Sequence, residues 1–286
     1  MPASGQLTNT DWPLQRMPNC SAVLLLVLAG VWLAGGRCQP ADLHQLPQLL
    51  DAQNVHATAR TYLRIGFCDI DQGRGPDGQV DLGRTARCLQ GFDLLVLQHV
   101  RGASWVGPDQ LQSLGRSLAQ ASVFVPTVQQ FWTDRQGYGM LSRLPIEPRE
   151  VIPLGSPEDD VCGSVLLAKV ELGGQPVNVL TASLHADCDR QRQVARLVDC
   201  FLKVPAPAVL VGDLDLDAGD EQLARLQDSS DVTLVAPAPS ESGEPSREAD
   251  GRRCWLVLRG LDTGDSKVQP TPLARAPLLQ ADVKLR

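Results

Sequence analysis

Four side chains with metal-binding chemistry lie where apolar runs of the chain end. Asp69 and His99 each lie near the end of such a run, and Asp213 and Asp215 follow another one. Carboxylate oxygens are preferred ligands of Mg²⁺, whereas the imidazole nitrogen of histidine suits Mn²⁺ or Zn²⁺. Such a set could hold a divalent cation that neutralises a phosphate group and assists the attack of water on it.

Each of these residues also has a structural interpretation. Asp213 and Asp215 could be turn and helix-capping residues, and a lone histidine such as His99 is more often structural than a ligand. Asp69 favours a functional role more clearly, because a carboxylate in an apolar setting needs a partner. His185 lies two residues after Ser183, and on a strand these two side chains would point to the same face.

Strands and helices that alternate along the chain must position these side chains. Apolar runs predict strands at 62–70, 93–99, 122–125, 164–172, 176–183, 208–211 and 254–258. Helical spacing predicts helices after Asp81, over 108–120, after Asp189 and over 220–227. Gly173-Gly174 marks a hairpin in the middle of the chain. This order predicts one α/β domain with mixed sheets.

Composition excludes several classes of protein. Of the 286 residues, 43% are hydrophobic and 21% are charged, which excludes widespread disorder and a coiled coil. The formal net charge is −7, from 26 basic and 33 acidic residues. A surface that follows a phosphate backbone needs a basic excess, so we do not expect broad binding to nucleic acid.

The N-terminal region has the three-part pattern of a secretory signal peptide. Arg16 precedes the uncharged run 22–34, and Ala34-Gly35-Gly36 follows as a small-residue cleavage site. The run is short for a membrane span, although an uncleaved membrane anchor is the open alternative, and Met17 could be the true start. We expect a signal peptide over 1–36, a lead-in segment over 37–60 that is weakly helical from residue 41, and a folded domain over 61–286. Export would make the protein secreted or periplasmic.

The eight cysteines have no metal-binding spacing. Cys20 lies in the leader, so seven cysteines remain. Cys68 and Cys254 lie in apolar runs, so we expect buried, reduced thiols that alkylate slowly. The other cysteines could form one or two disulfides, and the sequence does not show which of them pair.

Several short motifs follow one another in a family-specific order: Phe67-Cys68-Asp69, Leu97-Gln98-His99, Tyr138-Gly139, Leu141-Ser142-Arg143, Ala182-Ser183-Leu184, Gly212-Asp213-Leu214-Asp215 and Ala281-Asp282-Val283. Over 62–286 the chain resembles the endonuclease/exonuclease/phosphatase (DNase I-like) superfamily. The resemblance implies an α/β fold, a four-layer sandwich in which two mixed β-sheets pack face to face with helices outside.

The resemblance also implies roles for individual residues. It assigns metal ligation to Asp69, His99 and Asp215, catalysis to Asp213, Asp282 and His185, and substrate binding to Tyr138, Arg143 and Ser183. The implied cofactor is a divalent metal, Mg²⁺ or Mn²⁺, with Zn²⁺ possible because of His99. His185 enters this set only as a replacement for a family histidine in a shifted register.

The motifs depart from the family pattern at the positions that matter most for chemistry. Asp69 and Asp215 stand where the family has asparagine, and His99 stands where it has a metal-binding glutamate. Ser183 and Val283 stand where it has histidines, and an alkyl side chain cannot accept a proton. General acid–base groups contribute about 10²–10⁴-fold to a rate, so these changes predict a degenerate site.

Two hypotheses follow for the function. The first is an exported pseudoenzyme of phosphoesterase ancestry, with weak or lost hydrolysis, that binds a partner protein. The second is an active metal-dependent phosphoesterase with a rewired Asp/His metal site, acting on a phosphoester small molecule or a lipid head group. We do not expect nucleic acid as a partner, and a membrane would be contacted only through an uncleaved leader.

Overall fold

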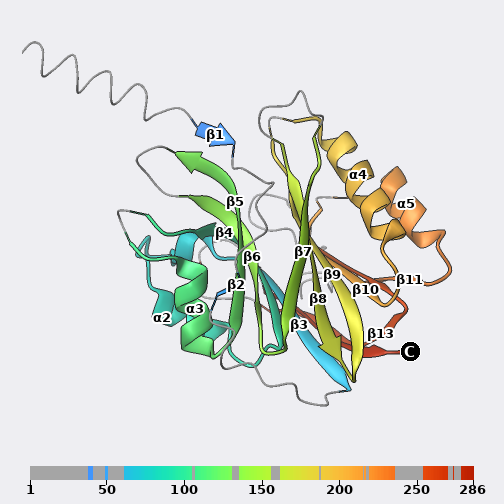
Figure 1. Cartoon of the computed structure of the whole chain (residues 1–286), viewed down its shortest axis with the longest axis horizontal. Helices are drawn as coiled ribbons and strands as arrows, with labels where there is room; N and C mark the ends of the chain where they lie inside the picture. The colour runs from blue at the N-terminus through green and yellow to red at the C-terminus, as the bar shows by residue number, and fades with distance from the viewer. Residues whose placement is uncertain are drawn as a thin grey trace, which may run out of the picture.

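Two β-sheets pack face to face in this protein, and helices cover both outer faces (Figure 1). The computed structural model describes residues 38–40, 49–50, 61–104, 107–130, 135–155, 162–186, 188–214, 216, 219–235, 254–269, 273 and 278–286. This arrangement is the predicted four-layer α/β sandwich, and the prediction is confirmed.

The first sheet has eight strands in the described part of the chain. They are β1 (Cys38–Pro40), β2 (Leu49–Leu50), β3 (Tyr62–Asp69), β4 (Leu94–Arg101), β5 (Ala121–Gln130), β6 (Gln136–Ser142), β13 (Leu261–Gln269) and β14 (Leu278–Leu285). β3 and β4 are parallel and are connected through helix α2 (Leu82–Cys88). The side chain of Asp81 accepts a hydrogen bond from the Arg84 N–H and caps this helix, as its residue type predicts. Parallel strands end at the same edge, so Asp69 lies beside Gln98.

The second sheet has six strands among the described residues. They are β7 (Ile146–Pro153), β8 (Ser164–Leu172), β9 (Gln175–Ser183), β10 (Ala208–Asp213), β11 (Val232–Val235) and β12 (Cys254–Arg259). Gly173 and Gly174 both have positive φ and form the turn of the β8–β9 hairpin. β9 and β10 are parallel, and helix α4 (Arg190–Lys203) connects them. The ends of β9 and β10 therefore also share one edge.

Three layers of apolar side chains hold the sandwich together. Between the sheets, Phe67 and Val96 from the first sheet join Val179 and Val209 from the second sheet in one buried cluster. Helices α2 and α3 (Gln110–Leu118) cover the first sheet, while α4 and α5 (Glu221–Gln227) cover the second (Figure 1). Phe201 of α4 is fully buried, and burial of such a side chain stabilises the fold by about 1.5–3 kcal/mol.

The sequence predicted the central elements better than the peripheral ones. Every predicted strand and helix after residue 60 is present, with ends shifted by a few residues. Strands β6, β7, β11, β13 and β14 were not predicted as strands. β7 shows the reason: it lies at a sheet edge and exposes much of its length, so polar residues and Pro148 interrupt its apolar pattern.

The segment before β3 forms two short strands where the structure describes it. β1 and β2 both pair with β5, so the expectation of weak helix is wrong at Leu49–Leu50. The expected signal peptide lies outside the described residues. Cys68 and Cys254 lie in buried strands, 0% and 6% exposed, as predicted. Among the described helices, none is long and apolar enough to cross a membrane.

Candidate functional site

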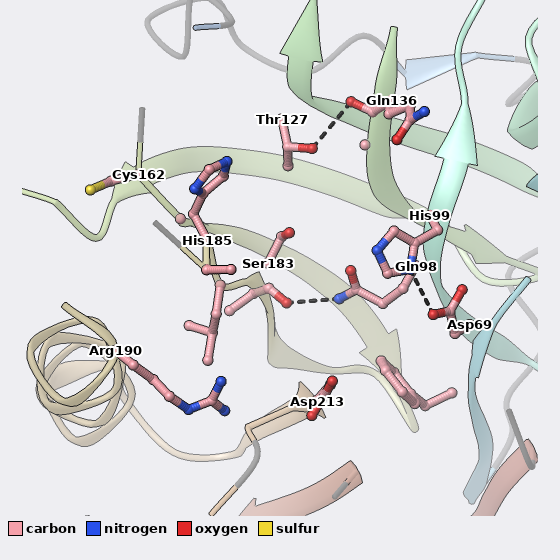
Figure 2. A pocket seen from close by; sticks show the side chains of 16 residues that line it. Asp69, Gln98, His99, Thr127, Gln136, Cys162, Ser183, His185, Arg190 and Asp213 are labelled. Atoms are coloured by element: carbon pink, nitrogen blue, oxygen red, sulfur yellow. Dashed lines mark hydrogen bonds and ion pairs between the residues drawn. The ribbon is translucent and has the colours of Figure 1, made fainter. Parts of the chain in front are cut away.

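A cavity of about 390 Å³ opens where strand ends from the two sheets meet. β3 and β4 contribute one wall, and β9, β10 and the start of α4 contribute the other (Figure 2). Its polar lining consists of Asp69, Gln98, His99, Thr127, Gln136, Ser183, His185, Arg190 and Asp213. The volume suits a small ligand. Of the nine predicted site residues, the fold brings together five: Asp69, His99, Ser183, His185 and Asp213.

Asp69 and His99 form a close pair on the first wall. Nδ1 of His99 lies 2.6 Å from Oδ2 of Asp69, while Oδ1 of Asp69 accepts the N–H of Asp71 at 2.9 Å. The pairing of β4 with β6 is irregular between Leu97 and Val100, and His99 has a φ of +48°. Such bulges redirect side chains near functional sites. The Asp69 side chain is 12% exposed and the His99 side chain 47%, so the imidazole faces the cavity.

The second wall carries His185, which lies in the short segment that follows β9. Several contacts hold this segment in place. Oε1 of Gln193 accepts the N–H groups of Gly163 and His185, and its Nε2 donates to the His185 carbonyl. A disulfide joins Cys162, directly before Gly163, to Cys188, three residues after His185. Gln193 is 1% exposed, so these bonds are shielded from water. The segment therefore holds His185 at the cavity.

Arg190 and Asp213 complete this wall. Arg190 is the first residue of α4, directly after the cap Asp189, and its Nη2 donates to the Leu214 carbonyl at 2.9 Å. That contact ties the helix start to the chain that leaves β10, just beyond Asp213. Sequence reasoning gave Arg190 no role, although its position directly after the helix cap Asp189 was the available signal.

Gln98 joins the two walls across the floor of the cavity. Its Nε2 donates to the Ala182 carbonyl at 2.8 Å, from the first sheet to the second (Figure 2). Sequence reasoning missed this residue, along with Thr127 and Gln136. It also could not pair Cys162 with Cys188, because disulfide partners follow from spatial proximity alone.

Two of the predicted substrate-binding residues lie elsewhere. Tyr138 is fully buried between the sheets, where its hydroxyl donates to the Ser164 carbonyl at 3.0 Å. Burial raises the pKa of this phenol. The N–H of Arg143 donates to the Asp93 carbonyl, at the opposite end of β4 from His99. Neither residue lines the cavity, so the structure does not bring them together with the other predicted site residues.

Asp282 also lies away from the cavity. It pairs with Arg64 in the β14–β3 register, five residues before Asp69, and accepts from Arg64 Nε at 2.8 Å. Five residues of strand span about 16 Å. Val283 is 1% exposed in the core between the sheets, so it does not mark a lost catalytic position. The structure therefore does not bring this motif together with the cavity residues. Asp215 lies outside the described residues.

The described residues do not fit a divalent metal. None of them form a group of three or more His, Cys, Asp or Glu side chains arranged to hold an ion. Both oxygens of Asp69 already accept, one beside His99 and one from Asp71. A hard cation such as Mg²⁺ wants oxygen ligands, and here an imidazole takes the place of a carboxylate.

Comparisons with known proteins agree with the architecture. No protein-family model and no curated protein sequence matches the chain. Solved structures do match. An endonuclease/exonuclease/phosphatase from Beutenbergia cavernae is 20% identical with a TM-score of 0.61, covering 79% of this chain and 72% of that one.

Two eukaryotic structures match over a similar span. The human Nocturnin catalytic domain with bound sulfate is 13% identical with a TM-score of 0.55, covering 84% of this chain and 98% of its own. D. rerio TDP2 complexed with single-strand DNA product is 16% identical with a TM-score of 0.51. The match covers 78% of this chain and 99% of that one. With its two packed sheets and its outer helices, the chain has the DNase I-like fold of the endonuclease/exonuclease/phosphatase superfamily.

Proposed function

We propose that this protein binds a small phosphoester or a similar anionic ligand in the cavity, and that the metal-dependent hydrolysis of its fold family is weak or lost. The fold supports phosphoesterase ancestry. The contact between Asp69 and His99 carries the second part of the proposal. It joins two positions at which the resemblance expects separate metal ligands.

The two replacements satisfy each other chemically. An aspartate at the asparagine position adds a negative charge, and a histidine at the glutamate position removes one and supplies a hydrogen-bond donor. At 2.6 Å the two groups form a charge-assisted contact when the imidazole is protonated. A metal would have to break that contact before it could bind Asp69, which opposes loading of the site.

The ligand class follows from the groups that line the cavity. Arg190 supplies a guanidinium, His99 and His185 supply imidazoles, and Ser183 supplies a hydroxyl. Arginine matches the geometry of phosphate oxygens particularly well. Nocturnin has been solved with sulfate, an anion of the same shape. The net charge of −7 favours a single phosphate group over a long nucleic acid.

Calorimetric titration with inorganic phosphate and with Mg²⁺, Mn²⁺ and Zn²⁺ tests this proposal. We expect phosphate to bind in the presence of a chelator, and Arg190→Gln to weaken that binding about tenfold. Arg143→Gln is the matched control, because Arg143 lies at the far end of β4. Phosphate binding that requires Mg²⁺, or an affinity that is unchanged in Arg190→Gln, would contradict the proposal.

An active phosphoesterase is the second candidate. Asp213 lines the cavity opposite Asp69, so the two carboxylates could still hold a cation with help from Asp215. In that case a generic phosphodiester would be hydrolysed with Mg²⁺, Mn²⁺ or Zn²⁺, and Asp213→Ala would abolish turnover. Clear turnover of this kind would replace the first proposal.

We also propose that the protein is exported to a secreted or periplasmic location. The Cys162–Cys188 disulfide supports this, since such bonds persist mainly in oxidising compartments. N-terminal sequencing of the exported protein should find a start near Arg37. A start at Met1 or Met17 would contradict cleavage and favour a membrane anchor.

A further inference from the structure

Both histidines that the structure describes lie at the same cavity. His99 comes from β4 of the first sheet, and His185 follows β9 of the second sheet. Figure 2 shows the two rings on different sides of the cavity, with Arg190 reaching in from the start of α4. Two imidazoles and a guanidinium are the groups that metal-free phosphodiester chemistry requires: a base, an acid and a stabiliser of phosphate charge.

His99 is arranged as the base. Its Nδ1 lies 2.6 Å from Asp69 Oδ2, which favours the tautomer with the proton on Nδ1. Nε2, on the opposite edge of the ring, is then the nitrogen that can accept a proton. Asp69 also stabilises the imidazolium that forms. The side chain of His99 is 47% exposed at the cavity, so a ligand can reach it.

His185 is arranged as the acid. Gln193 binds both its backbone N–H and its carbonyl, and the Cys162–Cys188 disulfide holds the neighbouring chain. These bonds fix the backbone that carries the ring, so the imidazole starts from a defined place on the cavity wall. Arg190 lies on the same wall, where its guanidinium can bind the phosphate between the two rings.

From this juxtaposition we infer that the cavity cleaves phosphodiesters that carry a hydroxyl next to the esterified oxygen, without a metal. The inference rests on the proposed binding of a phosphate group. The neighbouring hydroxyl oxygen attacks phosphorus and its proton passes to His99 Nε2. The bond from phosphorus to the leaving oxygen breaks, and that oxygen takes a proton from the imidazolium of His185. The products are a cyclic phosphodiester and an alcohol, and no oxidant or metal is consumed.

A hydroxyl of the substrate takes the place of water as the nucleophile, because a group already held next to phosphorus needs no binding site of its own. A tethered nucleophile has an effective concentration of up to about 10⁵–10⁸ M, which replaces much of what a metal-bound hydroxide would supply. A hydroxyl next to the esterified oxygen occurs in ribonucleotides and in phosphate esters of inositol or glycerol. The net charge of the chain favours small esters over long polymers.

The test uses the full mature chain in excess EDTA with three 4-nitrophenyl phosphodiesters. The substrates are the 3′-esters of uridine and thymidine and the 1-ester of myo-inositol. We expect release of 4-nitrophenol from the uridine ester, the inositol ester or both, depending on which of them the cavity accommodates. The thymidine ester lacks the neighbouring hydroxyl and should release none. Equal release from thymidine, or no release without added metal, would overturn the inference.

Two variants separate the base from the acid. His99→Gln should reduce cleavage about 10²–10⁴-fold for every substrate, because proton removal is always needed. His185→Gln should barely affect 4-nitrophenyl esters, whose leaving group needs no proton, but should reduce cleavage of uridylyl-3′,5′-adenosine about 10²-fold or more. Arg143→Gln should behave as the parent. If both histidine variants were as active as the parent, the assigned roles would be wrong.

Phosphate titration of the same samples separates the two proposals. If phosphate binds but no cyclic product forms, the inference fails while the proposed binding function stands. If phosphate does not bind in EDTA, both fail. Melting curves of each variant show whether a loss of activity reflects unfolding.

Discussion

Asp69 and His99 lie on neighbouring parallel strands, with Asp69 Oδ2 and His99 Nδ1 2.6 Å apart at the rim of the cavity. Each replaces a residue that the family resemblance assigns to a metal. Their contact makes the two changes compatible, because the histidine can donate a hydrogen bond to the added carboxylate. Under the proposed function, this hydrogen-bonded pair takes the place of metal ligation at this edge of the sheet.

Replacing this pair should restore a response to Mg²⁺. The melting temperature of the wild-type protein should not change with Mg²⁺, whereas Asp69→Asn/His99→Glu should melt higher when Mg²⁺ is added. Ligand at 100 times its dissociation constant stabilises a fold by about 2.7 kcal/mol. His99→Glu alone is the control: it places two carboxylates together, so it should melt lower than the parent without metal. An unresponsive but folded double variant would contradict this account.

Gln98 should contribute to the joining of the two sheets. Gln98→Leu removes the hydrogen bond to the Ala182 carbonyl and leaves that oxygen without its donor. The expected loss in the free energy of unfolding is about 1–3 kcal/mol, measured by urea denaturation. Gln112→Ala on the partly exposed face of α3 is the comparison and should change stability by less than about 0.5 kcal/mol.

We expect Tyr138 to stabilise the folded state as a core residue, and we expect this contribution to be lost at alkaline pH. Its hydroxyl contacts both the carbonyl and Oγ of Ser164 at 3.0 Å, so Tyr138→Phe should cost about 1–2 kcal/mol at pH 7. Burial raises the pKa of the phenol in the folded state. Its proton therefore stabilises the fold fully below the unfolded-state pKa, about 10, and this contribution is lost as the pH rises above it. Melting curves from pH 8 to 11 should show the parent losing its advantage over Tyr138→Phe.

Reduction of the Cys162–Cys188 disulfide should lower the stability of the fold and also weaken ligand binding at the cavity. The bond closes a loop with a sequence separation of 26, for which chain entropy predicts about 3.5 kcal/mol. Reductant should therefore lower the melting temperature of the parent and weaken its binding of phosphate, since His185 lies between β9 and Cys188. Cys162→Ser/Cys188→Ser should already show both losses and should not respond to reductant. A response of the double variant would point to another disulfide.

The amino-acid sequence determined the central strands and helices by itself. The runs before Asp69 and His99, the Gly173-Gly174 hairpin and the apolar face of α4 all form local patterns, because one buried face repeats with the period of its element. The peripheral strands escaped prediction, since an edge strand such as β7 has little buried surface and no clear period. The order of motifs also gave five of the cavity residues, because parallel strands bring their carboxyl ends to one edge of a sheet.

Only the tertiary structure decided the rest. Tyr138 and Asp282 matched motifs in order, yet strand register placed one in the core and the other beside Arg64. Alternation along β14 buries Ala281 and Val283 and turns Asp282 away from the core, and a shift of one residue would reverse this. The pairing of Asp69 with His99, the bridge from Gln98 to Ala182 and the disulfide join residues far apart in the chain. Local patterns cannot specify such contacts, because they depend on how the two sheets meet.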